Sequence, residues 1–271
     1  MKIPMALALV AISAGAFAAP PPTGHWHFEP RPAWSDEFDG HGKPDPSKWS
    51  YDLGGDGWGN DELECYTDRI GNASVGDGVL TITARKEPAC DRRGYTSARL
   101  VSKHKGDFLY GRIEVRARLP KGRGLWPAIW MLPTDWSYGE WPRSGEIDIM
   151  EQVGFDPDNI HASVHTQAYN HIAHTQKTAT RVIEDATTRF HLYRVDWVPS
   201  GITGYIDGRQ VFHFDNEGTG VDAWPFDRRF HVLLNLAVGG FWGGQQGVDP
   251  AAFPATMQVD YVRVYRLVDG K

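Results

Sequence analysis

Cysteine, a basic excess and long apolar runs are scarce or missing in this sequence of 271 residues. Its two cysteines, Cys65 and Cys90, lack the Cys-x-x-Cys spacing of zinc sites, so no four-ligand zinc centre is expected. A net charge of −6 offers no basic stripe for nucleic acid, and no nucleic-acid partner is predicted. Beyond the N-terminal segment no apolar run is long enough to cross a bilayer, so no membrane partner is predicted.

The N-terminal segment has the pattern of an export signal. Lys2 supplies a positive charge, residues 5–17 are almost all apolar or small, and Ala16-Phe17-Ala18 fits the small-x-small cleavage rule. A buried N-terminal helix is the alternative, but the prolines at 20–22 would end any helix. The pattern predicts a signal peptide over residues 1–18 and a secreted or periplasmic protein.

One domain is expected in the mature chain. A Pro-rich arm over residues 19–32 precedes it, and residues 33–268 suit a single large all-β domain. Because an exported chain meets an oxidising compartment, a disulfide between Cys65 and Cys90 is expected, with two free buried thiols as the alternative.

Alternation of apolar and polar residues dominates this domain. Residues 79–85, 108–119 and 256–267 show the period-two pattern of half-buried strands. Asp207-Gly208 between two apolar stretches indicates a hairpin, and residues 230–238 are so apolar that both faces of that strand should be covered. Helical periodicity is weak. The sequence predicts an all-β fold, a two-sheet antiparallel β-sandwich or jelly roll.

One strand carries three carboxylates. Alternate strand residues share a face, so Glu146 and Asp148 point one way while the isoleucines that follow each of them face the core. Strict alternation would bury Glu151 without a partner, which is costly. We therefore predict one extra residue near Met150, a β-bulge that returns Glu151 to the face of the other two carboxylates.

Three carboxylates on one face can supply both an acid and a base for catalysis. Their repulsion raises the pKa of one of them, which then holds a proton near neutral pH. By chain order, Glu146 would be the nucleophile and Glu151 the acid and then the base, with Asp148 hydrogen-bonded to Glu146. Position alone leaves the two glutamate roles interchangeable, and a solvated acidic edge strand is the alternative.

The carboxylate segment, residues 145–151, resembles the motif of family 16 glycoside hydrolases in their laminarinase-like branch. The resemblance extends over essentially the whole mature chain. Its further motifs are Trp34-Ser35-Asp36-Glu37-Phe38, Gly57-Trp58-Gly59-Asn60-Asp61-Glu62-Leu63-Glu64, Tyr95-Thr96-Ser97-Ala98-Arg99, residues 124–133, Asn235-Leu236-Ala237-Val238-Gly239-Gly240 and Val259-Asp260-Tyr261-Val262-Arg263-Val264-Tyr265.

This resemblance implies a concanavalin-like jelly roll with a substrate cleft across its concave sheet, and retaining, endo-acting hydrolysis. The spacing with Met150 is the bulged version associated with laminarinases and agarases, which favours β-1,3-glucan as the polysaccharide partner. No cofactor is expected for catalysis, and the protein is expected to be a monomer. A non-catalytic glucan-binding lectin, or an enzyme acting on mixed-linkage glucan or agarose, is the alternative.

Eleven tryptophans exceed what a core needs, and exposed indole faces suit sugar rings. Trp126 and Trp130 lie an even number of residues apart and should share a strand face, and Trp141 precedes the carboxylates. Trp242 lies in a Gly-rich loop. All four are predicted to bind substrate, with core positions as the alternative.

Several polar residues are candidates for the same cleft. By resemblance, Asn60 and Glu62 line a subsite, although a polar turn is the alternative for Glu62. Arg99 is expected to reach sugar hydroxyls or a catalytic carboxylate. His165 matches a cleft-strand position, with a structural role as the alternative, and His171 is interpreted as a solvated loop residue.

The resemblance also suggests a structural calcium ion on the convex side, away from catalysis. The matching positions are Glu37, Gly78 and Asp260, partly through backbone oxygens, which suit a hard cation. The sequence alone does not suggest this site.

Overall fold

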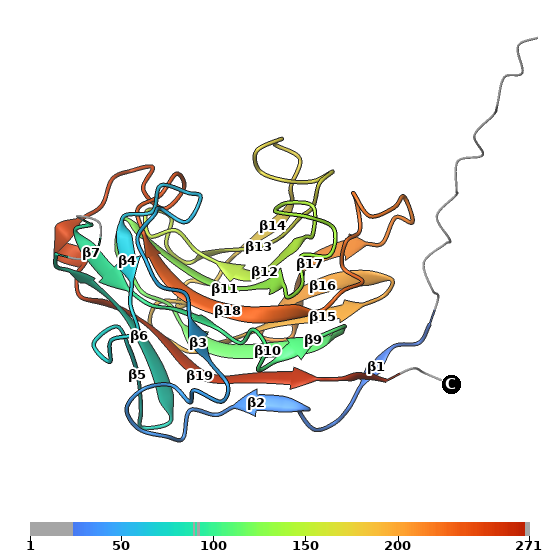
Figure 1. Ribbon diagram of the computed structural model, residues 1–271, viewed down its shortest axis with the longest axis horizontal. Helices are drawn as coiled ribbons and strands as arrows, with labels where there is room; N and C mark the ends of the chain where they lie inside the picture. The colour runs from blue at the N-terminus through green and yellow to red at the C-terminus, as the bar shows by residue number, and fades with distance from the viewer. Residues whose placement is uncertain (1–23, 89, 91–92, 269–271) are drawn as a thin grey trace, which may run out of the picture.

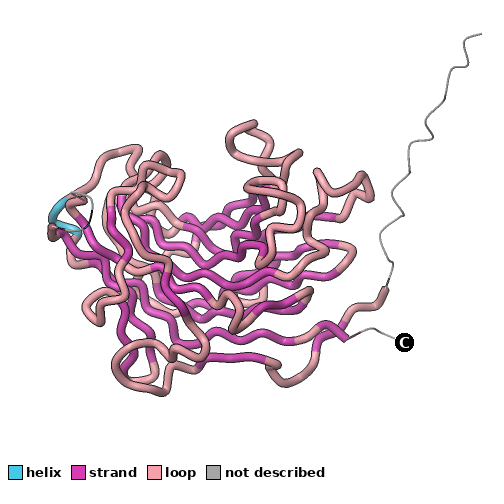
Figure 2. Tube along the Cα trace, in the orientation of Figure 1, coloured by secondary structure: helices cyan, strands magenta, loops and turns pink. Residues whose placement is uncertain are grey.

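The computed structural model describes residues 24–88, 90 and 93–268. The predicted signal peptide and the first part of the predicted arm lie outside the described residues. Two large sheets pack face to face (Figure 1), and strands form most of the fold (Figure 2). In this described part, no helix has the length and hydropathy needed to cross a membrane.

The first sheet has ten strands, with β2 and β5 added beside the main path. In spatial order they are β17 (Arg209–Asp215), β16 (Gly201–Ile206), β15 (His191–Val198), β10 (Gly111–Arg118), β19 (Ala255–Tyr265), β6 (Val79–Lys86), β7 (Tyr95–Ser97) and β4 (Glu64–Tyr66), with β2 (Trp34–Asp36) on β19 and β5 (Ala73–Gly76) on β6.

The second sheet has eight strands and carries the predicted site. In spatial order they are β14 (Lys177–Val182), β13 (Asn159–His165), β12 (Glu146–Glu151), β11 (Leu125–Pro133), β18 (Phe230–Val238), β8 (Arg99–Val101) and β3 (Ser50–Tyr51), with β9 (Asp107–Phe108) on β18. A small third sheet pairs β1 (His27–Phe28) with β20 (Leu267–Val268), and a 3-10 turn, η2 (Pro250–Ala252), precedes β19.

The strands predicted from alternation are confirmed. Asp207 and Gly208 close the β16–β17 hairpin with φ values of 49° and 75°, and positive φ at both positions is what a two-residue hairpin turn needs. All nine residues of β18 are buried, as the apolar run predicted. Strand pairing is antiparallel, as predicted for the sandwich, except between the short strands β4 and β7, which run parallel. A parallel pair of three-residue strands leaves no mark on the apolar pattern of the sequence.

The core lies between the two large sheets. On β10, Ile113, Val115 and Ala117 are fully buried against it while the arginines and the glutamate between them face outward. The opposite face of the eight-stranded sheet carries Trp126, Glu146 and Glu151, all half-buried. We call this face the open face; loops rise beside it at both ends of the sheet (Figure 1).

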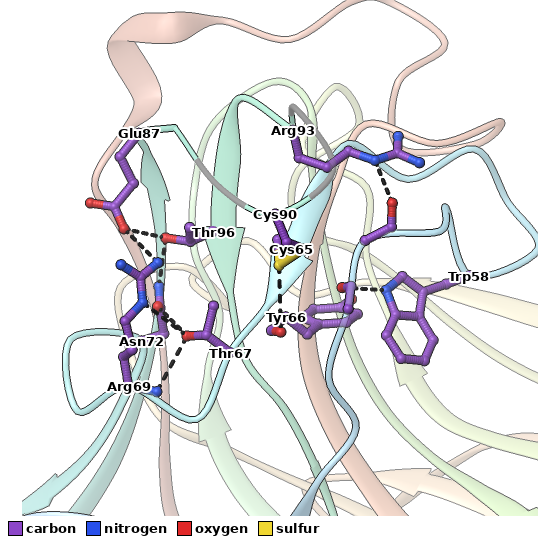
Figure 3. Close-up of a disulfide and its surroundings, with 12 residues drawn as sticks. Trp58, Cys65, Tyr66, Thr67, Arg69, Asn72, Glu87, Cys90, Arg93 and Thr96 are labelled. Carbon is purple, nitrogen blue, oxygen red and sulfur yellow. Dashed lines mark hydrogen bonds and ion pairs between the residues drawn. A yellow bond between two sulfur atoms is a disulfide. The ribbon is translucent and has the colours of Figure 1, made fainter.

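A disulfide anchors one of these loops. Cys65 of β4 is joined to Cys90, with 5.8 Å between their Cα atoms (Figure 3). Near it, the Arg93 guanidinium donates to the backbone oxygens of Gly55 (2.5 Å) and Glu62 (2.8 Å). The loop that carries Asn60 and Glu62 is therefore held by the disulfide at Cys65 and by the two hydrogen bonds from Arg93.

Candidate active site

The predicted bulge is present in the carboxylate strand. On one side of β12, Ile129 pairs with Met150 and its neighbour Trp130 pairs with Asp148, so Ile149 is the extra residue. On the other side, the three steps of β12 from Asp148 to Glu151 oppose only two steps of β13. Ile149 and Met150 are both buried. The bulge therefore restores Glu151 to the open face that Glu146 and Asp148 already occupy.

Glu146 and Asp148 lie together with a histidine from the next strand. His165 pairs with Glu146 across β12 and β13, and its Nε2 lies 3.3 Å from Asp148 Oδ2. Trp141 donates its indole N–H to Glu146 Oε2 at 2.8 Å. Asp148 and His165 are only 3 % and 7 % exposed, so Asp148 sits beneath the half-buried Glu146.

Glu151 has an indole donor of its own. Trp126, on β11, donates its N–H to Glu151 Oε1 at 3.0 Å. Trp126 and Trp130 share the open face as predicted, with Leu125 and Ile129 fully buried on the other side of the strand. Each of the two candidate catalytic glutamates is thus held by one tryptophan.

Burial gives all three carboxyls a raised pKa. It raises the pKa of Glu146 to about 8, with the charge of Asp148 as the next cause. It raises the pKa of Glu151 to about 7, with the charge of Glu146 adding to it. Burial and then the charge of Glu151 hold the pKa of Asp148 well above its usual range. Such a group keeps protons at a pH where exposed carboxylates have lost them.

The hydrogen bonds of the three carboxyls affect which of them holds a proton. Asp148 is the most deeply buried of the three carboxyls; its hydrogen bond with Glu146 lowers the pKa of Asp148 and raises that of Glu146, whose Oε2 also accepts the Trp141 N–H. The Trp141 N–H favours an ionised Glu146, the form that a nucleophile needs. Glu151, with a pKa of about 7, still carries a proton in much of the neutral population and is able to protonate a leaving oxygen.

The predicted subsite residues Asn60 and Glu62 belong to one polar network. Asn60 Nδ2 donates to Glu62 Oε1 at 2.9 Å, and the Tyr66 hydroxyl donates to Glu62 Oε2 at 3.2 Å. Asn235 Nδ2 donates to the Tyr66 hydroxyl at 3.0 Å, while Asn235 Oδ1 accepts the Trp130 N–H at 2.7 Å. Glu62 is only 5 % exposed, so it holds Asn60 in place rather than standing free on the surface.

Arg99 lies between two of the aromatic residues. Its guanidinium is 4.9 Å from the Trp58 ring and 4.7 Å from the Trp130 ring, and it is paired with Asp52 at 3.0 Å. Arg99 was expected to reach either sugar hydroxyls or a catalytic carboxylate. In the described structure it forms no ion pair with Glu146 or Glu151. Its position beside Trp130 leaves the sugar as the expected partner.

Trp242 extends the aromatic surface on the far side of Glu151. Its ring makes edge contacts with Trp126 (5.4 Å between centroids) and with His161 (4.8 Å). His161 is the β13 residue paired with Glu151, and burial lowers its pKa. Exposed His171 stands 5.0 Å from the Trp141 ring, so it is a neighbour of the site and not only a solvated loop residue.

Of the three predicted calcium positions, Glu37 follows β2, Gly78 precedes β6, and Asp260 lies in β19, which pairs with both of these strands. The Glu37 carboxylate, however, is bound by the Arg263 guanidinium at 3.0 and 2.7 Å, and Asp260 is bound by Arg116 at 2.5 Å. Carboxylates paired in this way do not fit a calcium ion as ligands. The backbone oxygens at the three positions remain as candidate donors, and the calcium site stays a prediction.

Sequence reasoning missed Tyr66, Asn235 and His161 as members of the site. Asn235 did carry a signal, because it interrupts the apolar run of β18 with a polar side chain. Tyr66 carried none, since a tyrosine in a short strand is most simply a core residue.

Residues 60–263 match the model of the family described as glycosyl hydrolases family 16. The chain belongs to glycosyl hydrolase family 16. This family 16 chain is 56 % identical over 253 residues to a β-glucanase of Rhodothermus marinus, and the alignment covers 90 % of this chain and 87 % of that protein.

Solved structures of related proteins have the same fold as this family 16 chain. The X-ray structure of the laminarinase from Rhodothermus marinus matches it with a TM-score of 0.86 and 55 % identity, covering 90 % of this chain and 99 % of that one. A variant of SCLam, a non-specific endo-β-1,3(4)-glucanase crystallised with 1,3-β-D-cellotriosyl-glucose, matches with a TM-score of 0.85 and 44 % identity, covering 91 % and 98 %. The predicted family and the predicted jelly roll are confirmed.

Proposed function

We propose that this chain hydrolyses internal β-1,3-glucosidic bonds of laminarin-type β-glucans with retention of configuration. Its relatives include proteins named β-glucanase and laminarinase, which supports a β-1,3-glucan substrate. The observation that carries the proposal is the extra residue in β12, because it puts Glu151 on the same face as Glu146. Two carboxyls on one face are what a double displacement requires.

In the first step, an ionised Glu146 attacks the anomeric carbon while Glu151 gives its proton to the leaving glycosidic oxygen. A glycosyl-enzyme ester forms and the leaving sugar departs with its new hydroxyl. In the second step, Glu151 removes a proton from water, the water oxygen attacks the same carbon, and Glu146 leaves as a carboxylate. Asp148 stays hydrogen-bonded to Glu146. Only protein carboxyls and water take part, so the proposal includes no cofactor.

The aromatic and polar residues around the carboxylates would hold the chain of sugars. Trp126 and Trp242 flank Glu151, while Trp130 and Arg99 lie toward β18 and β8. Indole faces pack against the apolar faces of sugar rings, and Asn60 offers hydroxyls a polar partner. His165 acts through Asp148 in this arrangement.

We further propose that the protein is exported by the signal peptide over residues 1–18 and acts as a monomer. The disulfide between Cys65 and Cys90 supports export, because such bonds persist in oxidising compartments. Mass determination of the secreted protein would check cleavage after Ala18, and its elution volume would check the monomer.

The release of reducing ends from laminarin tests the activity. Wild type should release them, and Glu146→Gln should release almost none while still binding the polymer. Glu140→Gln, in an exposed loop, is the matched control and should keep full activity. Proton NMR of the first products should show the β-anomer before mutarotation. A wild type that binds laminarin without cutting it would replace this proposal with a glucan-binding lectin.

A broader substrate range is the second candidate. SCLam, at 44 % identity, is named as a non-specific endo-β-1,3(4)-glucanase, which favours tolerance of mixed linkages in this chain too. Initial rates on laminarin, lichenan and agarose separate the possibilities. Comparable rates on the first two would assign mixed-linkage activity, and a preference for agarose would overturn the glucan proposal.

A further inference from the structure

The carboxylate cluster also has the composition of a metal site. Glu146, Asp148 and His165 each place one ligand-type atom so that the three atoms lie within 4.8 Å of one another. They come from adjacent strands, with Glu146 paired directly with His165 across β12 and β13. Their positions are therefore fixed by the backbone ladder and not by a mobile loop.

One of these three side chains is short of a hydrogen-bond partner. Asp148 Oδ2 is a buried atom with no hydrogen-bond partner in the described structure, although His165 Nε2 lies 3.3 Å from it. Asp148 is 3 % exposed and His165 is 7 % exposed. A buried carboxylate oxygen without a donor is costly, and a cation bound to it would remove that cost.

The distance between the Asp148 and His165 ligand atoms suits a small divalent ion with tetrahedral coordination. Metal–ligand bonds of about 2.0–2.1 Å, as in zinc sites, place neighbouring ligand atoms about 3.3 Å apart. His165 Nε2 and Asp148 Oδ2 are 3.3 Å apart. Their hydrogen-bond alignment is poor, since Asp148 Oδ2 remains without a donor at this distance.

The ligand types select zinc over the hard cations. One imidazole nitrogen with two carboxylate oxygens resembles the three protein ligands of open zinc sites, whereas Ca²⁺ and Mg²⁺ prefer oxygen ligands alone. Glu146 is half-buried, so the fourth coordination position would face the open face and hold water.

We propose that Glu146, Asp148 and His165 form an inhibitory binding site for Zn²⁺. The ion takes the electron pair of Glu146 that would attack the sugar, and it occupies the space of the reacting carbon. Zinc and substrate therefore exclude each other. The metal site itself is independent of the proposed glucanase function, whereas the inhibition rests on it.

Calorimetric titration of the purified, tag-free protein with ZnCl₂ tests the binding directly. Wild type should bind one equivalent. His165→Gln and Asp148→Asn should each weaken that binding by at least about tenfold, the low end of what a lost partner costs a metal site. His213→Gln is the matched control, since His213 forms an exposed pair with Asp215 at 3.0 Å, and it should leave the isotherm unchanged. Thermal melts of each variant establish that it is folded.

CaCl₂ and MgCl₂ in place of ZnCl₂ test the selectivity, and neither should give the saturable isotherm. Laminari-oligosaccharide added before the titration should weaken zinc binding, and zinc should inhibit laminarin hydrolysis competitively. An isotherm unchanged in both His165→Gln and Asp148→Asn would place the ion at surface histidines and overturn the proposal. Absence of zinc binding in wild type would overturn it as well. Zinc binding at the cluster in a protein that cuts no glucan would overturn the proposed function alone.

Discussion

Trp126 and Glu151 are joined by a hydrogen bond of 3.0 Å from the indole Nε1 to the carboxylate Oε1. This N–H favours the ionised carboxylate and so lowers the pKa of Glu151, while burial and the charge of Glu146 raise it to about 7. The pKa of Glu151, the proposed acid, therefore results from opposing effects, and the effect of Trp126 is to lower it.

The pH profile of Trp126→Phe tests whether Trp126 lowers the pKa of Glu151. The acid must be protonated to act, so activity should fall as the pH rises through about 7 in the wild type. Removing the N–H raises the pKa of Glu151, and the alkaline limb of kcat/KM should move up by about one pH unit, since a hydrogen bond to a charged group is worth about 1.5 kcal/mol or more.

Trp242→Phe is the control for this experiment. Trp242 contacts the Trp126 ring but gives no hydrogen bond to Glu151 in the described structure. It should raise KM and leave the alkaline limb in place. An alkaline limb that stays unmoved in Trp126→Phe would refute the assignment of Glu151 as the titrating acid.

Glu146→Gln should gain stability as it loses activity. The folded pKa of Glu146, about 8, lies above its ordinary 4.5, so this carboxyl favours the fold while protonated. That contribution is lost as the pH rises from about 4.5 through about 8. Glutamine has no charge to bury, and we expect it to be about 1–3 kcal/mol more stable than wild type at pH 8. Chemical denaturation at pH 4 and pH 8 checks this; a gap of equal size at both pH values would contradict it.

Tyr66→Phe should weaken substrate binding by disrupting the polar network around Glu62 and Asn235. The lost hydroxyl leaves Glu62 Oε2 and Asn235 Nδ2 without their partner, at a cost of about 1–3 kcal/mol. Because Asn60 and Trp130 are held through these groups, KM for laminarin should rise more than kcat falls. Tyr193→Phe removes a buried hydroxyl without a partner in the described structure, and should change neither stability nor KM appreciably. Equal effects of the two substitutions would show that the network does not position substrate.

Replacing both cysteines with serine should destabilise the protein without changing its chemistry. Cys65 and Cys90 close a loop over a sequence separation of 25, worth about 3 kcal/mol in the unfolded chain. A melting temperature lower by roughly 6–12 °C is expected for a domain of this size. Reductant should lower the melting temperature of wild type toward that of the variant, and the variant itself should not respond.

The fold was predictable because alternation is a local property of each strand. The patterns that predicted β6, β10, β19 and the Asp207-Gly208 hairpin lie within a dozen residues of sequence. The bulge was predictable for a physical reason, because Glu151 had no acceptable place in the core.

The wider site was less predictable because its contacts are long-range. Asn235 and Tyr66 are 169 residues apart and meet only through the order of strands in the folded protein. Arg99 had two expected partners in the sequence, and its pairing with Asp52 depends on where β3 and β8 lie. The parallel pairing of β4 with β7 is likewise set by the path of the chain between them.

The extra residue of β12 makes the reacting strand locally softer than the sheet around it. Ile149 and Met150 are as buried as any core residue, yet the ladder steps over one position between Asp148 and Glu151. Amide protons at that step should exchange with solvent deuterium faster than those of β11 and β18 on the same sheet. A bound oligosaccharide that engages Glu146 and Glu151 together should slow this exchange, so the carboxylate strand would report substrate occupancy through its own backbone.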